Sequence, residues 1–339
     1  MPAVLPKRLR SFLAFSVFAL APLSAASIDK ITVFAKGTDV NATGPDSITL
    51  SNDSVWIAYT NGADSTGASG SSIVVQYDFT GKIVNQYTLP GYVDGLDYDQ
   101  ERDLIWILQN QDGNSVLNLL MPNKGFTSNS PLAYTVKSST RGYDEVAFVN
   151  GAIYMSYTNP LNPTDATIQY VTSVSPTVSF VDILLQNATG TNLATGATNQ
   201  PTTDTDSDSL KVTPLGSLML TSGNDGQLIF VEHPGLPTQA VSFLQLIDPN
   251  TGKAVSGLDD AVFVTTPAGS FYVADTGNNQ VLKVDVSDLE PMSLYASVGS
   301  LNFVASVDMT SGVVTPFITN VMAPHGLYYV PRFTSLSGH

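Results

Sequence analysis

Six short segments of this chain begin with a side chain that can bind a cation or carry a proton. In each, that residue is followed by a small or polar residue and then by an apolar run. The first residues of successive segments are 48, 50, 64, 51 and 66 positions apart. Carboxylates ligate hard divalent cations, and an imidazole can act as a general base or as a metal ligand. The segments are Asp46-Ser-Ile-Thr-Leu, Asp94-Gly-Leu-Asp-Tyr, Asp144-Glu-Val-Ala-Phe, Asp208-Ser-Leu-Lys-Val, Asp259-Asp-Ala-Val-Phe and His325-Gly-Leu-Tyr-Tyr.

The regular recurrence of these segments predicts a repeat architecture. In the first repeat, three more strand-like runs follow the start, at Val55–Tyr59, Ile73–Tyr77 and Ile83–Tyr87. They are rich in β-branched and aromatic residues, and Gly, Asn and Asp separate such runs along the chain. Four antiparallel strands, repeated about six times, are typical of an all-β fold, the β-propeller. We therefore predict six four-stranded blades around a central channel, with five or seven blades as alternatives.

The two ends of the chain bear on how such a ring closes. Ile31–Phe34 is similar to the fourth strands of other repeats, such as Val313–Phe317, so we expect the N-terminal strand to join the last blade. We assign Phe271–Asp275 as the second strand of the blade that begins at Asp259. The chain ends soon after His325, and strand-like material in residues 293–308 is expected to complete the last blade.

A closed ring would place the six starting residues at one mouth of the channel, because the first strand of each blade lines it. At an effective dielectric constant of 20, two carboxylates ~6 Å apart repel each other by roughly 3 kcal/mol. Such a ring needs a cation or protons. Ca²⁺ is the first choice because it takes six to eight oxygen ligands, and Mg²⁺ or Mn²⁺ follow. The alternative is that each Asp only caps a turn through its own backbone. The predicted metal ligands are Asp46, Asp94, Asp144, Asp208 and Asp259.

Two further polar features lie outside this pattern. Arg141 precedes the third segment, and we interpret it either as a group that holds a substrate anion or as half of a plain salt bridge. Asp204, Asp206 and Asp208 alternate along one loop, but the Gly and the late Glu of an EF-hand loop are missing. We interpret that loop as a solvated acidic segment.

The first 26 residues have the pattern of a secretory signal peptide. Three basic residues precede the apolar run Phe12–Leu20, and small residues follow up to Ala26. Cleavage after Ala26 would leave one propeller domain at residues 27–339, secreted or periplasmic.

The charge and the absence of cysteine narrow the possible partners. The chain holds 14 basic and 29 acidic residues, and removal of the three basic residues of the signal peptide changes its net charge from −15 to about −18. Such a chain repels nucleic acid and anionic membranes. With no Cys and only three His, oxygen-bound cations fit better than zinc. We expect a monomer that binds a small-molecule substrate, without nucleic-acid binding or membrane insertion.

The repeats also resemble a known superfamily. The stretch Phe271–Asp285 is similar to an NHL-type repeat, and the six starts resemble the SMP-30/gluconolactonase superfamily of six-bladed propellers and the virginiamycin B lyase type. In the hydrolases of that superfamily, Glu, Asn and Asp at the first positions of the innermost strands hold a catalytic Ca²⁺. Asp46 stands where such a Glu would stand, and His325 matches the channel His of the phosphatase-like branch.

This resemblance implies an exported, Ca²⁺-dependent hydrolase of a lactone or ester-like substrate. It would use His325 and Asp259 as catalytic groups and Arg141 to bind the substrate. A metal-dependent lyase of the virginiamycin B lyase type, with His325 as base, is one alternative. A non-catalytic binding or scaffold propeller is the other, because the fold alone does not define the activity.

Overall fold

The computed structural model describes residues 26–135 and 141–332. The predicted signal peptide lies outside these residues except for its last position. In the described part of the chain, no helix has the length and the apolar character that a bilayer span requires.

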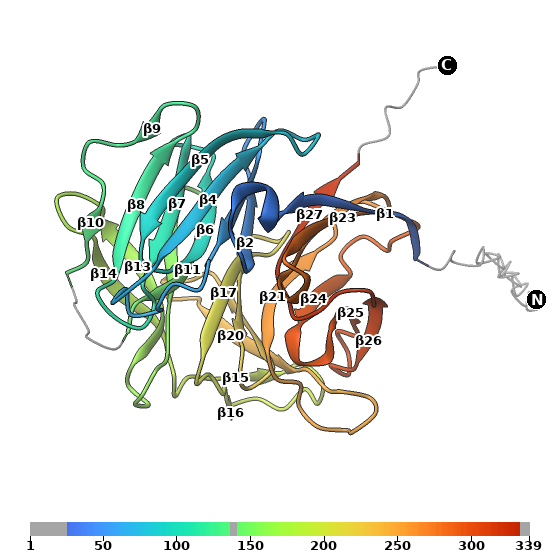
Figure 1. The fold of residues 1–339 in the computed structure, drawn as a ribbon. Coiled ribbons are helices and arrows are strands. Elements are labelled where there is room, and N and C mark those ends of the chain that lie inside the picture. The colour runs from blue at the N-terminus through green and yellow to red at the C-terminus, as the bar shows by residue number, and fades with distance from the viewer. Residues whose placement is uncertain (1–25, 136–140, 333–339) are drawn as a thin grey trace, which may run out of the picture.

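The strands form six sheets, arranged as the blades of a six-bladed β-propeller (Figure 1). The innermost strand of each blade contacts the innermost strands of its two neighbours, so the ring is closed. In ring order, the innermost strands are β2 (Pro45–Leu50), β6 (Val93–Asp99), β11 (Tyr143–Val149), β17 (Ser207–Val212), β21 (Leu258–Phe263) and β27 (Pro324–Pro331).

The outer strands follow the same ring order. The second strands are β3 (Val55–Tyr59), β7 (Leu104–Gln109), β12 (Ala152–Tyr157), β18 (Leu218–Ser222), β24 (Leu294–Val298) and β22 (Gly269–Asp275). The third strands are β4 (Ser71–Tyr77), β8 (Val116–Met121), β13 (Ala166–Ser173), β19 (Gln227–Glu232), β25 (Phe303–Val307) and β23 (Gln280–Ser287). The fourth strands are β5 (Ile83–Pro90), β10 (Leu132–Ala133), β14 (Ser179–Leu185), β20 (Ala240–Gln245), β26 (Val314–Ile318) and β1 (Ser27–Lys36).

A few short elements complete the blades. β9 (Gly125–Phe126) pairs with β8, and β15 (Thr189–Asn192) runs parallel to β20, so that it covers the edge of that blade and in turn pairs with β16 (Gln200–Pro201). This pairing covers the middle of the edge of β20, which leaves fewer free backbone groups to other chains. The 3₁₀ turns are η1 (Gly37–Val40), η2 (Thr276–Asn278) and η3 (Gly299–Leu301).

The last two blades are interlaced, which corrects two sequence predictions: the blade assigned to Phe271–Asp275 and the blade assigned to residues 293–308. β22 pairs with β27 and not with β21, so Phe271–Asp275 is the second strand of the His325 blade. Residues 294–318 supply β24, β25 and β26, which complete the blade of Asp259. The prediction that β1 closes the ring in the last blade is confirmed, because β1 pairs with β23 (blue beside orange in Figure 1).

Every innermost strand carries a β-bulge at its recurring motif. In each case the first two motif residues lie opposite a single residue of the neighbouring strand; Asp144 and Glu145, for example, lie opposite Ser156. A bulge bends the strand and redirects its side chains. The six bulges are Asp46-Ser47, Asp94-Gly95, Asp144-Glu145, Asp208-Ser209, Asp259-Asp260 and His325-Gly326.

Polar contacts and glycines accommodate these bulges. Ser156 accepts a hydrogen bond from the backbone N–H of Glu145 at 2.9 Å, and Ser297 accepts one from that of Asp260 at 3.2 Å. Buried backbone groups left without a strand partner are costly, so these hydroxyls stabilise the irregular backbone. Gly95 and Gly326 are required because a Cβ would overlap the carbonyl oxygen of Asp144 or of Asp46 on the adjacent strand.

The apolar core lies between the blades. The described buried residues form six clusters, and each cluster joins two adjacent blades. Trp56 and Trp106 are at most 1% exposed within two of these clusters. Because the apolar contacts lie between blades, the channel itself is left to polar side chains.

Candidate metal centre at the channel mouth

The six recurring residues line one polar cavity of about 180 Å³ at one mouth of the channel. We call them the acidic ring: Asp46, Asp94, Asp144, Asp208, Asp259 and His325. Both residues of most bulges face this cavity, because the bulge turns two consecutive side chains to the same side.

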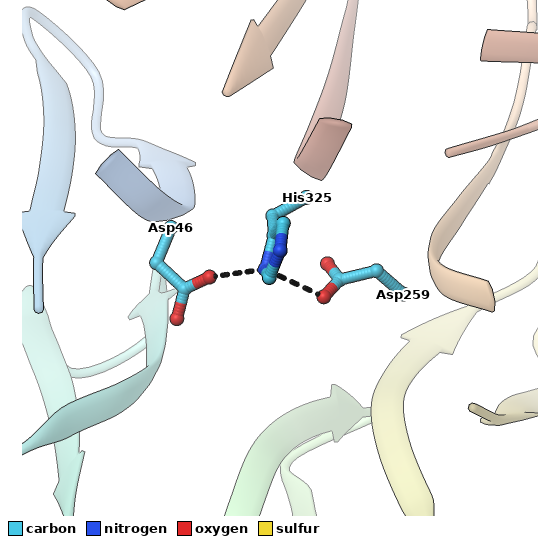
Figure 2. Close-up of side chains that lie close together, drawn as sticks. All are labelled: Asp46, Asp259 and His325. Atoms are coloured by element: carbon cyan, nitrogen blue, oxygen red, sulfur yellow. Dashed lines mark ion pairs between the residues drawn. The ribbon is translucent and has the colours of Figure 1, made fainter. Parts of the chain in front are cut away.

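His325 is the centre of the tightest group in this ring. Its Nδ1 lies 2.7 Å from Asp46 Oδ1 and 3.0 Å from Asp259 Oδ1. Figure 2 shows the imidazole between the two carboxylates, which come from β2 and β21 on either side of β27. Among the described residues, only this group brings together three possible metal ligands, with ligand atoms within 4.8 Å of one another.

The charges of this group depend on one another. The carboxylate of Asp259, followed by that of Asp46, raises the pKa of His325 to about 12 against the opposing effect of burial. The imidazole is therefore protonated when no other cation is bound. Burial raises the pKa of Asp46, although the contact with His325 opposes this shift.

A second group joins Asp94 and Asp144. The side-chain amide of Gln111 lies between them, and with its nitrogen toward the carboxylates it donates to Asp94 Oδ2 at 2.6 Å and to Asp144 Oδ1 at 2.5 Å. Burial raises the pKa of both carboxyl groups well above the usual range, and the neighbouring carboxylates raise it further. Burial, followed by the charge of Asp259, does the same to the pKa of Asp208.

The donor set fits an oxygen-bound cation. Asp144 is 3% exposed, and its Oδ2 atom is buried without a hydrogen-bond partner among the described residues. Such an oxygen is costly unless a ligand contacts it. The other members of the ring add carboxylate oxygens in the same cavity. Carboxylate-rich sites of this kind suit Ca²⁺, Mg²⁺ or Mn²⁺ rather than soft metals.

Several residues of the mouth were not predicted from the sequence. Gln111 and Thr158 line the cavity from loops that follow second strands, where Gly, Asn and Asp separate the strand-like runs of the sequence. Asp206 lines it from the loop before β17. Tyr92 also lines it, and the nearby carboxylates, first that of Asp46, raise its pKa. Tyr92 lies between β5 and β6, and nothing in the sequence distinguishes it from the other tyrosines.

A second set of charges lies deeper in the channel. Lys211 Nζ contacts Glu145 Oε2 at 3.2 Å and Asp260 Oδ2 at 3.6 Å. The charge of Asp97 acts on it as well, and the three carboxylates together raise the pKa of Lys211 despite its burial. Burial raises the pKa of Glu145 to about 8, although Lys211 opposes this. We call Lys211, Asp97, Glu145 and Asp260 the lysine cluster.

Two predicted features have other surroundings. Arg141 lies outside the residues that line the cavity, and its guanidinium contacts Asp165 Oδ2 at 2.9 Å and lies 3.9 Å from the ring centre of Tyr157. This matches the salt-bridge interpretation of Arg141. The interpretation of residues 204–208 as a solvated loop is wrong for Asp204, which is 1% exposed and accepts a hydrogen bond from Ser207 at 2.7 Å.

These observations define the class of protein: a six-bladed β-propeller with a polar, carboxylate-lined channel mouth. The sequence itself matches no protein-family model and no curated protein.

Solved structures share the fold. A candidate gluconolactonase has a TM-score of 0.50 at 10% identity, with 88% of this chain and 83% of that chain covered. The periplasmic gluconolactonase of Pseudomonas aeruginosa has a TM-score of 0.48 at 12% identity, with 85% and 88% covered. Virginiamycin B lyase of Staphylococcus aureus has a TM-score of 0.47 at 10% identity, with 88% and 95% covered. At such identities the likeness concerns the fold alone.

Proposed function

We propose that this chain is an exported, divalent-cation-dependent hydrolase that acts on a small lactone or ester at the acidic ring. The observation that carries the proposal is the convergence of Asp46, Asp259 and His325, whose ligand atoms lie within 4.8 Å of one another beside a cavity of about 180 Å³. Ca²⁺ is the proposed ion because the site offers many carboxylate oxygens.

Asp46 and Asp259, assisted by Asp94, Asp144 and Asp208, would hold the cation. A bound cation of this kind polarises a carbonyl oxygen. It would also balance carboxylates that burial and mutual repulsion otherwise force to take up protons.

His325 is proposed to transfer the proton. Its Nδ1 contacts the two carboxylates, which fix the orientation of the ring. Its side chain is 37% exposed, and its Nε2 makes no hydrogen bond to a described residue. Nε2 is therefore the ring atom that can exchange a proton with a molecule in the cavity, while a carboxylate supports the ring from behind.

The surroundings favour a neutral substrate. The cavity is lined by carboxylates, and the chain is strongly acidic, so an anionic substrate would be repelled. A lactone or ester carries the carbonyl oxygen that a cation can polarise and has no charge of its own. Arg141 does not line this cavity, so its proposed role in substrate binding is not part of this site.

The first experiment is metal analysis of the purified protein after equilibration with Ca²⁺ and removal of free ions. The double variant Asp144→Asn, Asp259→Asn should lose the bound ion. The matched control is Asp39→Asn, Asp288→Asn, which removes the same charge at two exposed positions outside the cavity. A wild-type protein without a stoichiometric divalent ion would contradict the proposal.

The second experiment tests the chemistry. The Ca²⁺-loaded protein is incubated with a panel of neutral lactones and aryl esters, and the products are weighed by mass spectrometry. Hydrolysis adds one water to the substrate, whereas a lyase cleaves without that gain. His325→Gln should lower kcat while the metal content stays near that of wild type. Metal binding without turnover of any substrate would favour a binding or scaffold propeller.

Export and oligomeric state are parts of the same proposal. The pattern of residues 1–26 supports a cleaved signal peptide. N-terminal sequencing of the protein from the extracellular or periplasmic fraction should begin at Ser27, and light scattering should give the mass of a monomer.

A further inference from the structure

The opposite mouth of the channel opens into a second and larger cavity of about 460 Å³. It is lined by the other ends of the innermost strands, so it lies across the channel from the acidic ring. Lys211 lines both cavities, and the lysine cluster lies between them. This second cavity differs from the carboxylate-lined cavity of the acidic ring because aromatic residues contribute to its walls. They are Tyr98, Phe148, Phe263 and Tyr328.

Two carboxylates that line this second cavity, Asp97 and the exposed Glu101, form no ion pair with a described residue, and Asp97 is the one that belongs to the lysine cluster. Asp97 Oδ1 accepts hydrogen bonds at 2.8 Å from the hydroxyl of Thr49 and from the backbone N–H of Tyr98. Within the described chain, Asp97 Oδ2 receives no hydrogen bond, and no basic group lies within 4.0 Å of the side chain. Lys211 is within ion-pair distance of Glu145 and Asp260 instead.

Asp97 and Lys211 line this cavity, whereas Glu145 and Asp260, the ion-pair partners of Lys211, line the cavity of the acidic ring. On this side of the channel, the carboxyl group of Asp97 is therefore left without an ion pair to a described residue. At the rim, Arg102 is already paired with Asp99 at 2.7 Å, so it adds no free positive charge.

We propose that this second cavity binds an organic cation, with an ammonium head group against Asp97 and an apolar body against Phe148 and Phe263. The carboxylate compensates the charge, and aromatic faces attract cations through their quadrupole. The cavity has the size of small-molecule sites, which combine apolar walls with a few converging polar groups. An inorganic divalent ion fits less well because, among the described residues of this cavity, no three possible acidic or imidazole ligands converge within 4.8 Å. The proposal is independent of the chemistry at the acidic ring.

The test uses 2-phenylethylammonium and its neutral counterpart 2-phenylethanol, titrated by calorimetry into the Ca²⁺-loaded protein. The ammonium compound should bind saturably and at least ~10-fold more tightly than the alcohol, since tenfold corresponds to about 1.4 kcal/mol. Asp97→Asn, which preserves the shape of the side chain, should weaken its binding by a similar factor. Equal binding of the two compounds, or no saturable binding up to ~10 mM, would overturn the proposal.

A matched variant locates the bound probe. Asp144→Asn removes a carboxylate from the acidic ring and should leave the affinity for the ammonium compound within about twofold. If Asp144→Asn abolishes binding and Asp97→Asn does not, the probe binds at the acidic ring and the proposal is wrong. Should Asp97→Asn fold poorly, Phe148→Leu and Phe263→Leu test the aromatic walls, and each should weaken binding ~3-fold. Unchanged affinity in both Leu variants would also overturn the proposal.

Discussion

The acidic ring and the lysine cluster place carboxylates in the same channel, one bulge residue apart. Asp144 and Asp259 belong to the ring, and the residues that follow them, Glu145 and Asp260, belong to the cluster. The cluster contains an ammonium group within 3.2 Å of Glu145, whereas the ring has only the imidazole of His325 for five carboxylates.

The two groups also differ in position. Glu145, Lys211 and Asp260 of the cluster line the same cavity of about 180 Å³ as the ring, and Lys211 and Asp97 line the second cavity, so the cluster lies between the two. The chain thus provides its own cation between the cavities. At the mouth, it leaves carboxylates that require a cation from solution or protons.

The largest effect is expected when the cation of the cluster is removed. Lys211→Met keeps most of the apolar part of the side chain but leaves Glu145 and Asp260 without their partner. Removing one member of a buried ion pair costs about 3–5 kcal/mol. Urea denaturation at neutral pH should show this loss of unfolding free energy. Adding Glu145→Gln and Asp260→Asn to the Lys211→Met variant should recover part of it. A stable single variant would contradict the view that Lys211 compensates the cluster.

The ring should respond to an added cation where the cluster does not. At a Ca²⁺ concentration a hundred times the Kd, binding to the folded state stabilises it by about 2.7 kcal/mol. Thermal unfolding with Ca²⁺ and with a chelator should show this as a higher Tm in Ca²⁺. The variant Asp144→Asn, Asp259→Asn should lose the difference, and Asp39→Asn, Asp288→Asn should retain it. The same Tm in Ca²⁺ and chelator for wild type would speak against a metal centre.

The sequence predicted the acidic ring because two features were enough to place it at one mouth of the channel. These are the spacing of the six segments and the position of the titratable residue at the start of each segment. The second bulge residues were missed, because simple alternation along a strand would turn Glu145 and Asp260 away from the channel. The extra residue of a bulge reverses that direction. Adjacent acids at Asp144-Glu145 and Asp259-Asp260 were the available signal.

The fold itself followed from the repeats, but the assignment of the last two blades did not. The strand Gly269–Asp275 is buried along its whole length, as a second strand would be beside either β21 or β27. Its local pattern is the same in both arrangements, since the pattern specifies which face is buried and not which strand is the partner. The nearest strand in sequence, β21, was therefore the natural but incorrect choice.

Asp204 extends the comparison to a buried acid that forms no ion pair with a described residue and does not line either channel cavity. Burial raises its pKa to about 7, and its Oδ1 has no hydrogen-bond partner among the described residues. The unfolded chain loses this proton near pH 4, while the folded protein keeps it up to about pH 7. Stability should therefore fall as pH rises through this window, by at most about 1.4 kcal/mol per pH unit.

Asp204→Asn should remove the contribution of Asp204 to the fall of unfolding free energy with rising pH. Near pH 4, where Asp204 is protonated in the folded protein, the substitution should change the unfolding free energy little. Asp288→Asn, an exposed position, is the control and should keep the slope of wild type. Denaturation curves between pH 4 and pH 8 measure both. Equal slopes for wild type and Asp204→Asn would mean that Asp204 is ionised in the folded protein.

The smallest effect concerns a neutral contact of the lysine cluster. Ser209 donates a hydrogen bond to Asp260 Oδ1 at 2.7 Å, and the backbone N–H of Ala261 donates to the same oxygen at 2.8 Å. Ser209→Ala should therefore cost only about 1 kcal/mol of unfolding free energy, since one donor is left. Ser306→Ala, which removes a longer exposed contact at 3.4 Å, should change it by less than about 0.5 kcal/mol. A loss at Ser209 as large as that of Lys211→Met would show that hydrogen bonds, rather than the ammonium charge, stabilise the carboxylates of the cluster.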